Sequence, residues 1–276
     1  MTVGVGLRCG RFVLDLAIPR VMGIVNVTPD SFSDGGRFDD PHAAIRHAER
    51  LIEEGADLID IGAESTRPGA MPVPADVEAS RLMPVLVALR DAPVPISVDT
   101  MKPEVMARAL GTGASMINDV AGFASPASQD VVTSSDCALC VMHMQGSPET
   151  MQAAAHYVDV ISEVAQLLRE RTAALIAHGI ARDRLVIDPG FGFGKTLEHN
   201  LTLLRRLDEL RSLGFPILVG LSNKGMIGAI TGRPIGERLA GNLATALVAI
   251  EGGARIVRVH DVAATVDAIK VWTAAR

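Results

Sequence analysis

The segments VMGIVNV (residues 21–27) and LIDIG (58–62) are short and nearly continuously apolar, and the stretch between them has the pattern of a helix. Asp40 is a suitable N-cap, Pro41 suits the first helical position, and Gly55 is a natural stop. Strands that are apolar along their whole length indicate a parallel sheet covered on both faces. These residues therefore predict a strand–helix–strand unit.

The same alternation continues to the end of the chain. Six further apolar runs predict strands at 95–99, 116–120, 138–143, 185–188, 217–221 and 256–260. Other segments predict helices near 103–110, 157–178, 198–211, 225–231, 237–251 and 263–274. Repeats of this kind form either an open doubly wound sheet or a (β/α)8 TIM barrel. Eight strands without a linker or a change of composition favour the α/β barrel.

The first residues have a different pattern. Residues 3–17, split by Cys9-Gly10, predict a β-hairpin that plugs the floor of the barrel. We expect a single domain over 1–276, with the hairpin in 1–18 and the barrel in 19–276. Three long connections follow predicted strands, at 28–40, 63–75 and 144–156. In a barrel all three lie at the C-terminal face, where active sites form.

Composition excludes several classes of protein. Of 276 residues 48% are hydrophobic, and 26 Lys and Arg stand against 32 Asp and Glu, for a net charge of −6. These values exclude a disordered chain and disfavour a nucleic-acid partner. The chain lacks an apolar run long enough for a membrane span, and its N-terminal residues do not resemble a signal peptide. With only three cysteines as well, we expect a cytoplasmic protein.

Polar residues end or follow most of the predicted strands. They are Asn26, Asp99, Asn118, Asp119, Asp188, Ser222, Lys224, Arg258 and His260. A single Asp in such a place can cap the following helix, but a buried one is costly unless it is paired. Because the strand ends of a barrel converge, we expect Asp99, Asn118 and Asp188 to share one site.

The residue types indicate a flat ligand that carries phosphate. Two carboxylates and a carboxamide complement a heterocycle with an aminopyrimidinone edge, over which Lys224 could sit. Arg67, Arg258 and His260 form a cationic group able to hold phosphate.

Two motifs are less informative. GFGFGKT (190–196) resembles a phosphate-binding loop, but Pro189 stands where that motif requires its first glycine. Cys137 and Cys140 form a CxxC inside an apolar strand, so we assign them to the core.

Eight segments are recognisable together. They are VMGIVNVTPDSFSDGG (21–36), DIGAESTRPGA (60–70), SVDTMKPEV (97–105), INDVAG (117–122), VMHMQGSPETMQ (141–152), IDPGFGFGKTLEHN (187–200), LVGLSNKGMIGAITGRP (218–234) and RVHDVAAT (258–265). In sequence and order they closely resemble the bacterial dihydropteroate synthases. That family has a TIM barrel, is usually homodimeric, and joins 6-hydroxymethyl-7,8-dihydropterin pyrophosphate to p-aminobenzoate, releasing pyrophosphate. Sulfonamides compete with its second substrate.

The resemblance implies a role for each matching residue. The implied pterin contacts are Asp99, Asn118, Asp188, Lys224, Met142 and Phe193. The implied pyrophosphate contacts are Asn26, Thr66, Arg67, Arg258 and His260, with Mg²⁺ bound near Asn26. The implied p-aminobenzoate contacts are Phe32, Thr66, Pro68, Phe193, Ser222, Lys224 and Gly225. The implied catalytic group is Asp99, Asp188, Lys224, Asp34 and Arg67. Loss of pyrophosphate would leave a pterin-methylene cation, stabilised by the two aspartates and attacked by the arylamine.

The chain departs from the family after the seventh barrel strand. The family usually has S-R-K-S, whereas this chain has Ser222-Asn223-Lys224-Gly225. The change could be neutral, could loosen the arylamine pocket and weaken sulfonamide inhibition, or could mark a pterin-binding paralogue without synthase activity. A second alternative is a methyltetrahydrofolate corrinoid methyltransferase. Methyl transfer would not require Arg67, Arg258 and His260 together, which counts against it.

Overall fold

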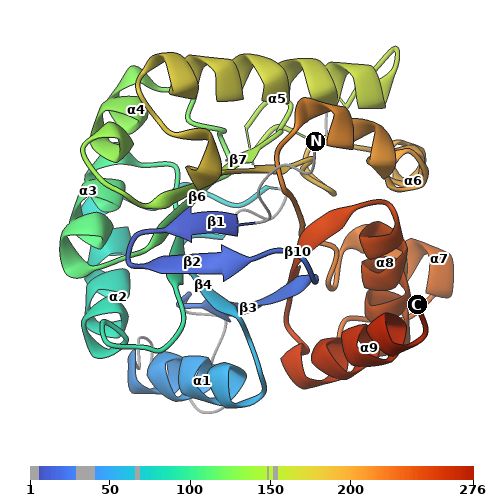
Figure 1. Ribbon diagram of the computed structural model, residues 1–276, viewed down its shortest axis with the longest axis horizontal. Coiled ribbons are helices and arrows are strands. Elements are labelled where there is room, and N and C mark those ends of the chain that lie inside the picture. Colours follow the sequence, from blue (N-terminus) through green and yellow to red (C-terminus); the bar gives the residue numbers. More distant parts are fainter. Residues whose placement is uncertain (1–5, 29–40, 66–68, 148, 152–154) are drawn as a thin grey trace.

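A computed structural model shows a closed barrel of eight parallel strands (Figure 1). The structure describes residues 6–28, 41–65, 69–147, 149–151 and 155–276. Around the barrel the strands follow the order β10-β3-β4-β5-β6-β7-β8-β9. Their bounds are β3 Arg20–Asn26, β4 Leu58–Gly62, β5 Ile96–Asp99, β6 Met116–Asp119, β7 Ala138–Met142, β8 Leu185–Asp188, β9 Ile217–Val219 and β10 Ala254–Val259. The predicted α/β barrel and all eight of its strands are confirmed.

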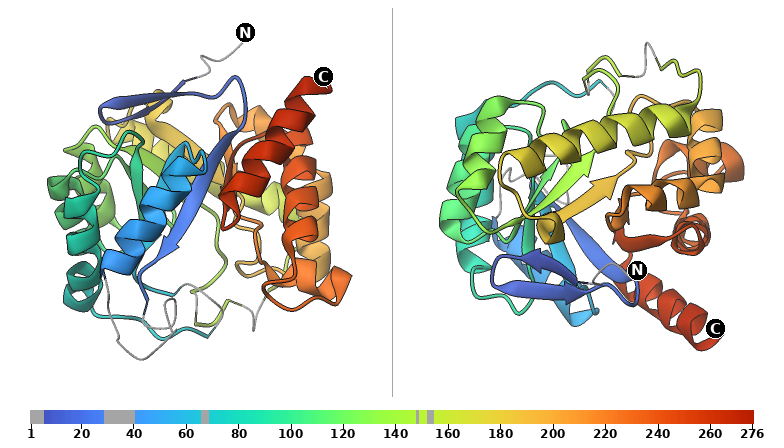
Figure 2. Two further views of the ribbon diagram at one scale, coloured as in Figure 1. Left: turned by 90° about the horizontal axis from the view of Figure 1, so that it is seen from below. Right: turned by 45° about the horizontal axis from the view of Figure 1, so that its top comes forward.

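Helices cover the outside of this barrel (Figures 1 and 2). They are α1 Pro41–Glu53, α2 Ala75–Ala88, α3 Pro103–Thr112, α4 Pro126–Thr133, α5 Val160–Ala177, α6 Leu197–Arg205, α7 Gly225–Thr231, α8 Leu239–Glu251 and α9 Val262–Ala274. The described part of the chain also contains two 3₁₀ segments, Arg182–Arg184 and Leu207–Leu213.

Three details differ from the sequence-based expectation. Helices α2 and α4 were not predicted, because α2 contains Pro84 and α4 has only eight residues with little apolar pattern. The helix expected over 198–211 is divided into α6 and the 3₁₀ segment Leu207–Leu213. These differences lie on the outside of the barrel and leave the strand order unchanged.

The N-terminal hairpin closes one end of the barrel. Strands β1 Gly6–Cys9 and β2 Phe12–Asp15 pair antiparallel and lie across the barrel in Figure 1. Leu7, Cys9 and Leu16 pack against the inward side chains at the beginnings of the barrel strands, which are Met22, Leu58, Met116, Ala138, Cys140, Val186, Leu218 and Ile256. The predicted hairpin is therefore confirmed, and its apolar contacts form the floor of the barrel. We call these residues the floor cluster.

A second apolar layer lies between the strands and the helices. It consists mainly of Val, Leu, Ile and Ala, and it includes Phe123 and Phe191 among its few aromatic residues. Cys9, Cys137 and Cys140 are free and buried, and burial raises the pKa of each thiol. The interpretation of the CxxC as core is consistent with this environment. Within the described ranges, every helix is too short or too polar to cross a membrane.

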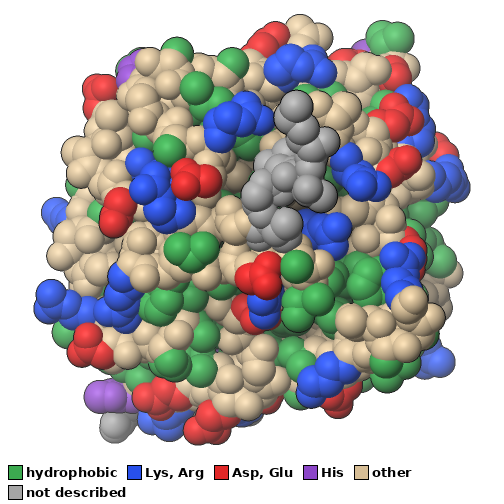
Figure 3. All heavy atoms as spheres, viewed as in Figure 1, with side chains coloured by type: hydrophobic (Ala, Val, Ile, Leu, Met, Phe, Trp, Pro, Cys, Tyr) green, Lys and Arg blue, Asp and Glu red, His purple; other side chains and the backbone are tan. Residues whose placement is uncertain are grey.

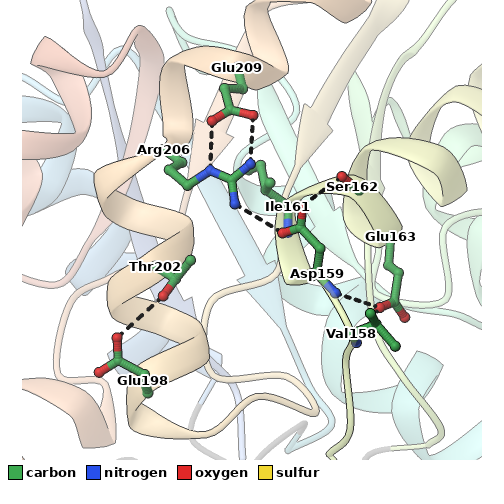
Figure 4. A network of polar contacts seen from close by, with 9 residues as sticks. All are labelled: Val158, Asp159, Ile161, Ser162, Glu163, Glu198, Thr202, Arg206 and Glu209. Carbon is green, nitrogen blue, oxygen red and sulfur yellow. Dashed lines mark hydrogen bonds and ion pairs between the residues drawn. The ribbon is translucent and has the colours of Figure 1, made fainter.

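Surface charges form local pairs of both signs. On the face shown in Figure 3, Lys and Arg are interspersed with Asp and Glu. Figure 4 shows one such group, in which Arg206 donates to both carboxylate oxygens of Glu209, at 2.6 and 3.0 Å, and to Asp159 at 3.0 Å. Asp159 is also the N-cap of α5. This exposed group links α6 to the start of α5, and we assign it a structural role.

Candidate active site

Four polar side chains from separate strands meet inside the mouth of the barrel, at the C-terminal ends of the strands. Arg258 on β10 donates from Nε to Asp60 Oδ2 on β4 at 2.6 Å, and from Nη2 to Asp99 Oδ2 on β5 at 3.0 Å. Asn118 on β6 donates to the same Asp60 oxygen at 3.2 Å. The Asp60 side chain is fully buried, and those of Asp99 and Arg258 are 12% and 19% exposed. We call these four residues the mouth cluster.

The strand register explains why they meet. Asp99 pairs with Asn118 on one side and with Gly62 on the other. A Cβ atom at Gly62 would lie in ordinary van der Waals contact with the Asp99 Cβ, at 3.4 Å, so β4 and β5 are close neighbours at this level. The barrel is closed between β10 and β3, which brings Arg258 into reach of carboxylates on β4 and β5.

The mouth cluster retains unused hydrogen-bond acceptors. Asp60 Oδ1, Asp99 Oδ1 and Asn118 Oδ1 are buried, and none of the described residues donates a hydrogen bond to them. Buried acceptors without donors are uncommon and costly in folded proteins. Three of them close together form a natural site for a ligand with several N–H donors.

Two carboxyl groups at the mouth of the barrel, those of Asp99 and Asp188, have raised pKa values. Burial raises the pKa of Asp99 to about 7, although Arg258 opposes the change. Burial also raises the pKa of Asp188, which is opposed by the hydrogen bond that Gly190 N–H donates to Asp188 Oδ1 at 2.7 Å. Both groups therefore hold a proton more readily than ordinary carboxylates, and this suits contacts to a heterocycle with donors and acceptors.

Lys224 lies over an aromatic ring beside these acids. Its Nζ is 4.2 Å from the centre of the Phe193 ring, a cation–π distance. Burial lowers its pKa to about 8, and the neighbouring Arg258 acts in the same direction. Phe193 also belongs to a small apolar cluster with Val120, Met142 and Met151. A flat ligand bound above Asp99 would find an apolar wall and a cation here.

The remaining described residues of the site lie near the rim. The Ser222 Oγ atom and His260 Nδ1 are 2.9 Å apart, and the His260 backbone N–H donates to the same hydroxyl at 3.3 Å. Asn26 is the last residue of β3 and is half-buried. By strand alternation it faces inward, like Met22.

Asn223 lies in the turn that leads into α7, and Gly225 is the first residue of that helix. Asn223 has a φ of 60°, in the left-handed region that Asn tolerates better than most residues. Its N–H donates to Asn242 Oδ1 at 2.9 Å, and its Oδ1 accepts from Asn242 Nδ2 at 3.2 Å. Asn242 also donates to Asp261 at 3.2 Å. The Asn223 side chain thus points to α8, and Asn242 connects it to Asp261 at the start of α9.

The structure brings together only part of the predicted site. Asp99, Asn118, Asp188, Lys224, Met142, Phe193 and Arg258 contact one another or shared neighbours. Five predicted residues lie outside the described residues: Phe32, Asp34, Thr66, Arg67 and Pro68.

Two aspartates need separate comment. Asp60 was not identified from the sequence, although a charged residue in the centre of the apolar run LIDIG was a usable signal. Asp119 follows Asn118 but accepts hydrogen bonds from the N–H groups of Ala121 and Phe123, at 2.8 and 2.7 Å. It therefore caps the turn that follows β6, whereas the alternative considered for such residues was a cap for the following helix, and α4 begins only at Pro126.

Comparisons with known proteins agree with this geometry. A family model described as "Pterin binding enzyme" matches residues 22–260. The dihydropteroate synthase of Neisseria meningitidis serogroup B is 49% identical, covering 97% of this chain and 96% of its own length. That of Escherichia coli K12 is 48% identical, with 94% and 92% covered.

Solved structures give the same result. Dihydropteroate synthase from Xanthomonas albilineans with 4-aminobenzoic acid superposes with a TM-score of 0.93 at 51% identity, covering 99% of this chain and 98% of the other. The Burkholderia cenocepacia enzyme complexed with 7,8-dihydropteroate has a TM-score of 0.91 at 49% identity, covering 100% and 98%. This chain belongs to the dihydropteroate synthase family of pterin-binding enzymes.

Proposed function

We propose that this protein is a dihydropteroate synthase, which condenses 6-hydroxymethyl-7,8-dihydropterin pyrophosphate with p-aminobenzoate and releases pyrophosphate and 7,8-dihydropteroate. The observation that carries the proposal is the mouth cluster, with its three buried acceptor oxygens that lack a donor among the described residues. It stands in a chain that resembles, over nearly its full length, enzymes solved with 4-aminobenzoic acid, 7,8-dihydropteroate and a sulfonamide drug.

The pterin would bind with its amino-pyrimidinone edge toward the mouth cluster. The ring N–H and amino groups supply donors for the free oxygens of Asp60, Asp99 and Asn118. Asp188 has one oxygen held by Gly190 and would use the other toward the ring. Lys224 and Phe193 would then contact the ring from above, together with Met142.

The diphosphate would lie toward the rim, near His260, Arg258 and Asn26. Among the described residues, no three His, Cys, Asp or Glu side chains are placed together so that they could hold a metal ion. Asn26 offers one carboxamide oxygen, and Mg²⁺ commonly takes one or two protein ligands together with substrate phosphates and water. We infer that Mg²⁺ binds with the diphosphate at Asn26. When bound, it would neutralise charge on the departing pyrophosphate.

The chain's own residues then supply the rest of the chemistry. Departure of pyrophosphate places positive charge on the pterin methylene carbon, and ionised Asp99 and Asp188 stabilise that charge through space. Arg258 and His260 hold the leaving anion. The arylamine nitrogen is already nucleophilic, so the protein needs chiefly to position it. For that substrate we propose Phe32, Thr66, Pro68, Phe193, Ser222, Lys224 and Gly225, and we propose that Asp34 and Arg67 complete the closed site.

Four further proposals concern the domain organisation, the oligomeric state, the location and the inhibition of the protein. We infer that residues 1–276 act as one domain, since the hairpin is part of the same apolar floor as the barrel. A homodimer and a cytoplasmic location follow from the family resemblance. Sulfonamides, which resemble p-aminobenzoate, would inhibit by competing for its pocket.

A coupled assay of pyrophosphate release tests the proposal. Release should require both substrates and Mg²⁺, and it should be abolished by Arg258→Met but retained by Arg255→Met. Arg255 is the control, because it lies near the beginning of β10, at the irregularity between Ala254 and Ile256, and not at the end of the strand where Arg258 lies. Calorimetry with the dihydropterin provides a second measurement, the affinity for the pterin. Tight pterin binding without turnover would instead show a pterin-binding paralogue, and methyl transfer unaffected by Arg258→Met would show a methyltransferase.

A further inference from the structure

The lysine of GFGFGKT (190–196) has no role in the proposed reaction, yet it is one of the most deeply buried charged residues of the protein. Lys195 is 3% exposed. Its Nζ is 2.9 Å from His143 Nδ1, 2.9 Å from the Gly190 carbonyl oxygen and 3.1 Å from the Phe193 carbonyl oxygen. It lies between the turn after β8 and the segment after β7.

These three contacts use the whole donor capacity of the side chain. A lysine ammonium group carries three hydrogens and accepts none. Burial lowers the pKa of His143 to about 3, so its ring is neutral and Nδ1 can accept the third hydrogen bond. Burial lowers the pKa of Lys195 to about 7, and the side chain carries all three hydrogens at pH values below this pKa. Unlike the lysine of a phosphate-binding loop, Lys195 has no hydrogen left for a phosphate oxygen.

The two carbonyl groups that it binds belong to residues next to the ligand site. The Gly190 N–H donates to Asp188, and the Phe193 N–H donates to the Gly190 carbonyl oxygen at 3.1 Å. The Phe193 ring contacts Lys224. Lys195 therefore binds the backbone of the turn at Gly190 and Phe193. Gly190 also orients the Asp188 carboxylate, and Phe193 carries the ring that contacts Lys224.

The turn is also packed tightly against the segment after β7. Gly190 has a φ of 69°, and a Cβ atom there would lie 1.9 Å from the His143 carbonyl oxygen. At Gly194, with a φ of 60°, a Cβ atom would lie 2.8 Å from the Gln145 carbonyl oxygen. Only glycine allows so close an approach, and this approach places His143 within reach of Lys195.

We propose that Lys195 is a positioning residue for the reaction, which holds the 190–194 turn so that Phe193 and Asp188 face the bound substrates. This inference rests on the proposed function for its kinetic consequences but not for its structural ones. Loss of the ammonium group would leave two backbone carbonyls and one ring nitrogen buried without this donor, and the turn would rearrange toward water.

Kinetics of Lys195→Met provide the first test. Methionine keeps the length and apolar part of the side chain but donates no hydrogen bond. We expect the KM for p-aminobenzoate to rise at least tenfold, with kcat at saturation falling less, because the wall that Phe193 provides would be misplaced. Lys270→Met is the matched control, since Lys270 is largely exposed on α9, and it should leave both constants unchanged. An unchanged KM in Lys195→Met would overturn the proposal.

Amide hydrogen exchange in the ligand-free protein gives a readout independent of turnover. In Lys195→Met, exchange at Gly190 and Phe193 should accelerate at least tenfold relative to the strands β7 and β8. His143→Leu removes one of the three acceptors and should accelerate the same amides to a smaller degree, which keeps the test open if Lys195→Met does not fold. Uniform acceleration over the whole barrel, or no change in the turn, would contradict the positioning role. A turn-specific effect of Lys195→Met, found together with a wild type that has no synthase activity, would refute the proposed function alone.

Discussion

The floor and the mouth of the barrel are built from the same strands but have opposite chemistry. In four strands the floor residue and the mouth residue are two positions apart: Leu58 and Asp60, Met116 and Asn118, Val186 and Asp188, Ile256 and Arg258. A period of two places both members of a pair on the same inward face. The floor buries only apolar side chains, whereas the mouth buries charges and leaves acceptors unused by the described residues.

We therefore expect the floor of the barrel to contribute mainly to stability and the mouth mainly to function. Apolar burial at the floor stabilises the fold without any directional requirement. The mouth cluster carries a desolvation cost that its ion pairs only partly offset. Substitutions at the floor and at the mouth should therefore differ in their effects on the free energy of unfolding and on turnover. The following four tests are arranged from the largest expected effect to the smallest.

Asp60→Ala should have the largest effect on both properties. It removes the partner of Arg258 Nε and of Asn118, and it leaves a buried guanidinium with Asp99 alone. Breaking a buried pair costs about 3–5 kcal/mol, and turnover should fall at least a hundredfold. Asp57→Ala is the control, because Asp57 forms a partly exposed pair with Arg20 at 2.9 Å and should cost about 1 kcal/mol. Urea unfolding and the pyrophosphate assay measure the two effects, and equal losses in both variants would contradict the comparison.

Met116→Ala should destabilise the protein without impairing the reaction. Met116 is fully buried in the floor cluster, and truncation of such a side chain costs about 2–5 kcal/mol. At temperatures where the variant is folded, kcat and KM should remain near the wild-type values. A large loss of kcat in the folded variant would mean that the floor and the mouth are energetically coupled.

Asp99→Asn should change how stability depends on pH. Because burial raises the pKa of Asp99 to about 7 in the folded state, folding is accompanied by proton uptake between about pH 4 and pH 7. The stability contributed by this proton is fully present below about pH 4 and is lost as the pH rises through 7. The free energy of unfolding of the wild type should thus decline relative to that of Asp99→Asn over this range. Urea titrations at pH 5, 6 and 7 would reveal it, and parallel curves would exclude the shift.

Asn223 should give the smallest effect, since its side chain binds Asn242 on α8 rather than a residue of the mouth cluster. Asn223→Ala loses the hydrogen bond that the side-chain oxygen accepts from Asn242 and places alanine at positive φ, at a cost of about 1–2 kcal/mol. Asn223→Gly keeps the backbone conformation and should cost less. Sulfonamide inhibition of Asn223→Arg distinguishes the earlier alternatives. An inhibition constant equal to that of the wild type would exclude a direct role of this position in the arylamine pocket.

Local patterns in the sequence were sufficient for the barrel and for most of its strand-end residues. Continuous apolar runs such as LIDIG can be read without tertiary information, because the requirements of a doubly covered parallel strand are local. Helices α2 and α4 were missed because their local pattern is weak and packing against the barrel defines them.

The hydrogen-bond and ion-pair partners of the polar residues could not be predicted from local sequence patterns. The sequence suggested a phosphate contact for Arg258. It did not show that the same guanidinium donates to Asp60 and Asp99, which are 198 and 159 residues away in the chain. Lys195 looked like part of a failed phosphate motif, and only the fold shows that it is buried against His143.

The sequence by itself determined the strands and most of the polar residues at the mouth, with the exception of Asp60, since the apolar pattern of a strand and the polar residues at its end can be recognised locally. Only the tertiary structure decided which of these groups are paired and which oxygens remain for a ligand. Closure of the barrel, which depends on contacts between strands far apart in the chain, brings the groups together.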